Sequence, residues 1–161
     1  MRTETRTTGQ GRGRGVVAVE VAVVLPLVCL LLVGIVSYGY MLSFRQALGR
    51  ASNAAATAAA VAVTAASAAD RLARAEEAVN SGLGNYGVRC VGGVLERDGE
   101  AVGTCSISVP HRCDASSVHG SRCVKVALDY QYRDHSPLPL LPGVGLVLPA
   151  NLHQGSEAEI S

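Results

Sequence analysis

One glutamate and four cysteines are the residues whose type and position most clearly suggest chemistry. Glu20 comes directly before a run of 24 uncharged residues that extends from Val21 to Phe44. A carboxylate at the centre of a membrane-spanning helix is disfavoured by about 2.5–3.5 kcal/mol on insertion scales, and by less near the helix end. Glu20 therefore either reaches back to water at the membrane surface or pairs with a cation. A cut after Gly15 would supply such a cation, the new amino group of Val16 on an adjacent subunit.

The four cysteines, Cys90, Cys105, Cys113 and Cys123, all follow the uncharged run. An even number of cysteines in an oxidising compartment predicts two disulfide bonds. Three pairings are open, and short loops favour Cys90–Cys105 with Cys113–Cys123. Zinc is the alternative, but the chain has no Cys-x-x-Cys pair, and gaps of 15, 8 and 10 residues fit no common zinc-ligand spacing. We expect disulfides, with no metal and no cofactor.

No grouping of residues predicts catalysis. The four histidines share no spacing, and no serine is placed with a histidine and an aspartate as a nucleophile with its base. The part of the chain after Phe44 carries nearly equal numbers of basic and acidic residues, without a basic stripe. This balance argues against nucleic-acid binding. A membrane-tethered enzyme with an unrecognised site is kept only as a third hypothesis.

The uncharged run is long enough to cross a lipid bilayer, since about 20 helical residues span about 30 Å of hydrocarbon. A cleaved secretory signal has a shorter apolar core and a small-residue cleavage site, which is missing here. Tyr38 and Tyr40 stand where aromatic side chains favour the membrane–water interface. Four arginines precede the span, and two, Arg45 and Arg50, flank its other end. The sequence therefore predicts a single-pass plasma-membrane protein with a cytoplasmic N-terminus and an extracytoplasmic C-terminal part.

The residues after the span predict a long helix followed by strands. Between Ala47 and Val79, 16 of 33 residues are alanine, the best helix former. One unbroken helix is expected, with an apolar stripe at 4-3 spacing that packs against a neighbouring helix. The stripe consists of Ala47, Ala51, Ala54, Ala58, Val61, Ala65, Ala68, Leu72, Ala75 and Val79.

Beyond residue 85 the pattern changes to short strands. We expect strands over 86–95 and 104–109, joined by a hairpin turn at Asp98-Gly99. The alternating residues 124–132 predict the clearest strand, and 146–152 predict a last one that Pro149 confines to an edge. The fold class is thus α+β, with a transmembrane helix that continues into a long alanine-rich helix, then a small antiparallel sheet.

The same patterns divide the chain into four segments. They are a basic cytoplasmic leader over 1–15, a transmembrane helix over 16–44, an alanine-rich helix over 45–80 and a disulfide-bearing β domain over 85–161.

The N-terminal part of the chain resembles the TadE-like family, whose members are minor pilin-like components of tight-adherence (Flp-type) pilus and secretion systems. The resemblance covers about residues 11–65. It rests on Arg14-Gly15-Val16-Val17-Ala18-Val19-Glu20, Leu25-Pro26-Leu27, Gly34, Tyr38-Gly39 and Arg45-Gln46-Ala47-Leu48, followed by alanines. Over 85–161 the likeness is diffuse. The resemblance implies a pilin-like (α+β) fold and cleavage between Gly15 and Val16 by a membrane prepilin peptidase.

The leading hypothesis is a processed, non-catalytic pseudopilin. It would take part in pilus or secretion-apparatus assembly through other pilin-like subunits, the assembly machinery and the bilayer. Glu20 would then be an assembly contact. The alternative is an unprocessed single-pass anchor that carries an extracytoplasmic binding domain.

Overall fold

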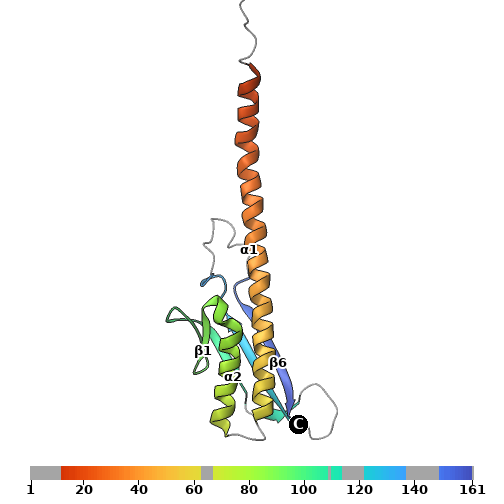
Figure 1. Cartoon of the computed structure of the whole chain (residues 1–161), viewed down its shortest axis with the longest axis vertical. Helices are drawn as coiled ribbons and strands as arrows, with labels where there is room; N and C mark the ends of the chain where they lie inside the picture. Colours follow the sequence, from red (N-terminus) through yellow and green to blue (C-terminus); the bar gives the residue numbers. More distant parts are fainter. Residues whose placement is uncertain (1–11, 63–66, 109, 114–121, 137–148, 161) are drawn as a thin grey trace, which may run out of the picture. The chain divides into compact units, whose positions relative to one another are not determined.

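A computed structural model describes residues 12–62, 67–108, 110–113, 122–136 and 149–160, and for residues 12–16 and 62 it describes the backbone alone. The chain divides into two compact units, one that ends at Gly39 and one that begins at Tyr40. Helix α1 (Arg12–Ala62) contributes residues to both units (Figure 1).

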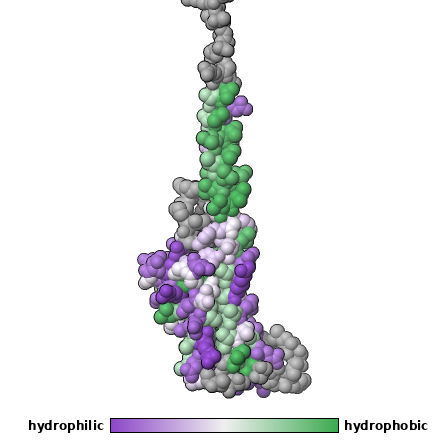
Figure 2. Space-filling view, in the orientation of Figure 1, coloured by the Kyte–Doolittle hydropathy of each residue, from purple (hydrophilic) through white to green (hydrophobic). Residues whose placement is uncertain are grey.

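The described part of the first unit is the first half of α1. Its side chains from Val17 to Val36 are all exposed, although most are apolar. Figure 2 shows this hydrophobic surface along the helix. Among the described residues, α1 is the one helix long and apolar enough to cross a membrane. A helix that is hydrophobic on all sides and unburied by protein is typical of a membrane span, so the finding is consistent with a single-pass anchor.

The second unit contains the rest of α1, a second helix α2 (Ala68–Leu83) and a single 3-10 turn η1 (Gly84–Tyr86). Here the structure differs from the single alanine-rich helix expected from composition, because a new helix begins after Ser67. The Ser67 hydroxyl accepts a hydrogen bond from the Asp70 N–H at 3.2 Å, and the Asp70 carboxylate accepts one from the Ser67 N–H at 3.2 Å. This capping box satisfies amides that a continuous helix would have bonded internally.

The buried face of the two helices also differs from the predicted stripe. Of the described stripe residues, Ala54, Val61, Ala68 and Leu72 are exposed, whereas Ala51, Ala75 and Val79 are buried. The fully buried positions of α1 include Phe44, Leu48, Ala51, Ala55 and Ala59, a face that shares Ala51 with the stripe. That face packs inside the same unit, against α2 and the sheet. The predicted stripe is therefore correct at Ala51, Ala75 and Val79 and wrong at its exposed positions.

The strands follow in one sheet. They are β1 (Val88–Val91), β2 (Val94–Arg97), β3 (Glu100–Ile107), β4 (His111–Arg112), β5 (Arg122–Tyr130) and β6 (Leu152–Ile160). All pairings among them are antiparallel, and the order is β1-β2-β3-β5-β4 with β6 on the other side of β5. Together with the long N-terminal helix, this sheet confirms the predicted α+β class.

Two glycine-containing turns shape the first three strands. The expected Asp98-Gly99 turn joins β2 to β3, with φ angles of 53° and 85°. Gly92 and Gly93, at 57° and 88°, form a second turn inside the segment 86–95, so that segment is a hairpin of two strands rather than one strand. Strand β5 matches the alternating segment closely. Of the predicted strand 146–152, residues 146–148 lie outside the described residues and 149–151 do not form a strand, because the observed last strand begins at Leu152.

Alternate residues of β5 and β6 face the helices and form the core. Val124, Val126, Leu128 and Tyr130 of β5 are buried. The ring of Phe44 in α1 packs edge-on against Tyr130, at 4.7 Å between ring centroids. The remaining β5 residues, such as Lys125 and Asp129, face the opposite, outer side of the sheet. This outer face presents most of the polar groups that could form a site.

Candidate functional site

Of the predicted site residues in the first unit, Glu20 is the one whose side chain the structure describes. Its side chain is exposed on α1. With Val21, Val24, Leu25 and Val28 it lines a shallow hollow of about 310 Å³ along the helix. A single carboxylate at the end of an apolar strip can accept a cation while the strip contacts other apolar surface. Among the described residues that line the hollow, none carries a positive charge that could pair with this carboxylate.

Gly15 and Val16 lie in the first turns of α1, where only the backbone is described. Residues four apart share one face of a helix, so Val16 and Glu20 lie on the same face, about 6 Å apart along the axis. The structure thus brings Val16 and Glu20 to one face of one helix. The four cysteines belong to the second unit.

The cysteines form two disulfides, in the same pairs that loop length favours. Cys90 in β1 and Cys105 in β3 are both buried in the core. The Cys105 N–H donates to the Gly93 carbonyl at 2.9 Å, which holds β3 against the turn after β1. The two Cα atoms are 6.0 Å apart, a usual separation for a disulfide. The bond therefore fixes the first hairpin to the centre of the sheet.

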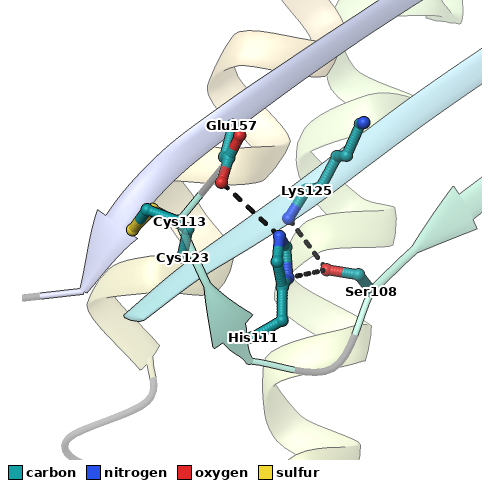
Figure 3. A network of polar contacts seen from close by, with 6 residues as sticks. All are labelled: Ser108, His111, Cys113, Cys123, Lys125 and Glu157. Carbon is teal, nitrogen blue, oxygen red and sulfur yellow. Dashed lines mark hydrogen bonds and ion pairs between the residues drawn. A yellow bond between two sulfur atoms is a disulfide. The ribbon is translucent and has the colours of Figure 1, made fainter. Parts of the chain in front are cut away.

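The second disulfide, Cys113–Cys123, lies on the outer face beside a network of polar contacts (Figure 3). His111 Nδ1 is 3.3 Å from the Ser108 hydroxyl, and His111 Nε2 is 3.5 Å from the Glu157 carboxylate. The hydroxyl also accepts a hydrogen bond from the Lys125 backbone N–H at 2.9 Å. These contacts tie the end of β3 and the short β4 to β5 and β6.

Sequence reasoning found no grouping of serine, histidine and acid, and the structure forms one from Ser108, His111 and Glu157. Glu157 is far from the others in sequence and comes beside them because it pairs with Lys125 across β5 and β6. A strand register cannot be read without knowing which strands are neighbours. Since the Ser108 hydroxyl is already bonded to the β5 backbone, the group acts as a connection between strands.

The second unit contains a polar cleft of about 650 Å³. Residues of both charges line it, including Arg89, Glu96 and Asp98. One wall is Asn80 of α2, whose side-chain amide donates to the Cys90 carbonyl at 3.2 Å and accepts from the Cys90 N–H at 2.6 Å. The amide thereby satisfies both backbone groups of Cys90 in β1.

Comparison with known proteins adds one finding. The family model described as TadE-like protein matches residues 15–57, which begin at Gly15 and include Glu20. No curated protein and no solved structure matches the chain. The N-terminal segment, which contains the exposed apolar helix, is therefore similar to that of TadE-like proteins.

Proposed function

We propose that this chain is a non-catalytic pilin-like membrane protein that takes part in the assembly of a tight-adherence (Flp-type) pilus or secretion apparatus. The observation that carries the proposal is the TadE-like match over 15–57, a segment that coincides with the long, exposed apolar helix. Members of this family are associated with such pili. The remainder of the chain contributes an extracytoplasmic unit, with the N-terminus in the cytoplasm as the flanking arginines favour.

The finer step in the proposal is removal of the leader by a prepilin peptidase, between Gly15 and Val16. In the uncut chain α1 begins at Arg12, so Glu20 lies in its third turn. After the cut the helix begins at Val16, and Glu20 moves close to the helix N-terminus. The partial positive charge of a helix N-terminus stabilises a nearby carboxylate by about 0.3–1 kcal/mol, and more where water is scarce.

The new Val16 amine is a second cation that is available only after the cut. Within one chain it lies on the same face as Glu20, and in a bundle of spans it can reach Glu20 of a neighbour. A pair between chains would fix the relative height of two spans, since any axial slip would leave a charge unpaired in the membrane. The apolar strip formed by Val21, Val24 and Val28 supplies the surface for such a neighbour.

The N-terminal residue of the protein recovered from native membranes tests the processing step. We expect Val16. Recovery of Met1 would remove the main support for a processed pseudopilin. Gly15→Leu is expected to block trimming, while Gly13→Leu, a glycine change two residues earlier, is expected to leave it unchanged.

The Glu20→Gln substitution tests the assembly contact separately from trimming. The neutral amide keeps the size of the side chain but cannot pair with an ammonium group. We expect normal trimming, together with loss of co-purification with other pilin-like subunits from solubilised membranes and loss of filaments. Wild-type assembly by this variant would eliminate the charge-pair hypothesis while leaving pilus membership open.

The second candidate function is an unprocessed anchored protein whose outer unit binds an envelope partner. The polar cleft near Asn80 and Arg89 is the observation that favours it. Retention of Met1, with normal activity of a Gly15→Leu variant in cells, is the outcome expected from this alternative.

A further inference from the structure

We propose that the Cys113–Cys123 pair, when reduced to two thiols, binds one zinc ion together with Glu157. This inference goes beyond the proposed function and does not depend on processing of the leader. It concerns the dithiol form of the chain, whereas the structure shows the disulfide form.

The positions of the three side chains carry the proposal. One ligand atom from each of Cys113, Cys123 and Glu157 lies within 4.8 Å of the other two. Zinc binds thiolate sulfur at about 2.3 Å and carboxylate oxygen at about 2.0–2.2 Å, so neighbouring ligand atoms of a tetrahedral site are roughly 3.5–3.8 Å apart. Opening the disulfide moves the sulfur atoms toward this separation, and the carboxylate needs to approach by roughly 1 Å.

The sheet holds these ligands in place before any metal arrives. Cys123 belongs to β5 and Glu157 to β6, two strands paired without interruption over nine positions. Cys113 directly follows β4, whose His111 pairs with Cys123. Because Cys123 and Glu157 both face outward from adjacent strands, their relative position is set by backbone hydrogen bonds rather than by the disulfide. Reduction therefore leaves two of the three ligands where they are.

His111 supplies the second layer of the site. Its Nε2 atom is 3.5 Å from the Glu157 carboxylate, and its Nδ1 atom is held by Ser108 (Figure 3). A histidine that contacts a ligating carboxylate orients it, and such outer contacts commonly change metal affinity by about 10–100-fold. The fourth position of the ion is left to water, as in a site with three protein ligands.

The chemistry balances in two steps. A phosphine reductant and one water convert the disulfide to two thiols, while the phosphine becomes its oxide and supplies the two electrons. Zinc then displaces both thiol protons and binds two thiolates and one carboxylate. The spacing rule that argued against zinc fails here because the third ligand comes from β6, far along the chain.

Zinc binding would also restrict how the four cysteines pair. With Cys113 and Cys123 held on one ion, Cys90 and Cys105 are left to each other. The pairing seen in the structure is then the outcome of oxidation, since the other two combinations need a thiolate from the metal site.

The test uses the full chain in detergent micelles, reduced with a phosphine, incubated with zinc sulfate and freed of unbound metal by gel filtration. We expect about one zinc per reduced chain and none per oxidised chain. The Cys113→Ala/Cys123→Ala variant should retain none. Failure of the reduced wild-type chain to retain zinc would overturn the proposal, as would equal retention by the double variant.

Glu157→Gln, with both cysteines intact, keeps the test decisive if the cysteine variant does not fold. Its matched control is Glu159→Gln, two residues along on the same exposed face but outside the ligand group. We expect Glu157→Gln to weaken zinc binding by at least about tenfold and Glu159→Gln to leave it unchanged. Cobalt in place of zinc should give a thiolate charge-transfer band. Equal affinities of the two glutamate variants would show that the carboxylate is no ligand.

Discussion

Gly103 of β3 pairs with Tyr130 of β5. A Cβ atom at this position would overlap the Asp129 carbonyl oxygen and press on the Tyr130 Cα. Both are backbone atoms, so neither can move without disturbing the β3–β5 pairing. Glycine is required here for space rather than for an unusual φ angle.

Gly103→Ala is therefore expected to lower the free energy of unfolding by about 3 kcal/mol, at the upper end for an overpacked site. Urea unfolding of the purified chain measures the change. Gly84→Ala is the matched control, because an added Cβ has no neighbour within 4 Å and φ is −55°. An equal loss in both variants would mean that glycine flexibility, and not the close approach, determines the effect.

Tyr130 is expected to lower the free energy of unfolding of the second unit at alkaline pH. Burial raises the pKa of its phenol, which donates a hydrogen bond to the His135 carbonyl at 2.8 Å. Above about pH 10 the unfolded chain loses this proton while the folded chain keeps it, so the free energy of unfolding falls as pH rises. The contribution is fully present below that pH and is lost as pH rises through the folded pKa.

Tyr130→Phe should reduce this alkaline loss, although it also removes a hydrogen bond worth about 1 kcal/mol at every pH. Unfolding free energies at pH 8 and pH 10.5 measure the difference for each protein. The burial-based interpretation is wrong if the wild-type chain and Tyr130→Phe lose the same amount between those two pH values.

At the scale of elements, the contact between α1 and α2 depends on a small residue in each. A Cβ added to Gly82 of α2 would lie 2.9 Å from the Ala51 Cβ and 3.2 Å from its Cα. Neither atom can move independently of the α1 backbone, so the helices would have to separate. The alanine content of α1 therefore serves a close approach to a helix of the same chain.

Gly82→Ala is expected to destabilise the chain by about 1–2 kcal/mol, since the clash outweighs a gain in helix propensity of up to about 1 kcal/mol. Its control is Ser81→Ala, an exposed neighbour on the same helix. Thermal unfolding monitored by circular dichroism compares the two. A Gly82→Ala variant more stable than the wild type would show that α1 and α2 can move apart without loss of stability.

The elements that could be predicted from the sequence are those in which neighbouring residues differ clearly in polarity or in turn preference. Apolar and polar residues alternate along β5, and Asp98-Gly99 marks the turn between β2 and β3, so both features could be predicted. The alanine-rich segment has no such contrast, because alanine on every side hides which face is buried. The break before α2 depends on Ser67 and Asp70, which are visible as a capping box only once the helix is expected to begin there.

The candidate sites divide in the same way. Gly15 and Glu20 are close in sequence, so their spacing alone suggested a role. Short loops favoured the disulfide pairs that the structure contains. Glu157 could not be placed beside Cys113 and Cys123, because its position follows from the register of β5 and β6 rather than from any local pattern.

For the whole molecule, the division at Gly39 and Tyr40 predicts that the two units can be studied apart. The continuous run of exposed apolar side chains lies before Gly39, whereas Phe44 and Leu48 are buried within the second unit. A chain that consists of residues 40–161 should be soluble without detergent and should elute as a monomer in gel filtration. Its near-ultraviolet circular dichroism should show the ordered packing of Phe44 against Tyr130. Aggregation of this chain, or loss of that signal, would mean that the first unit is needed for folding.

Asn80 hinders edge-to-edge strand pairing between copies of this chain at β1. An unpaired strand edge is a template for unwanted growth, because any extended segment can bond to it and seed insoluble fibres. The Asn80 amide already occupies the donor and the acceptor of Cys90 that such a segment would use. An intruding strand would have to expel this amide before gaining its first bond at that residue. At this edge, one side chain of α2 therefore opposes aggregation through strand pairing.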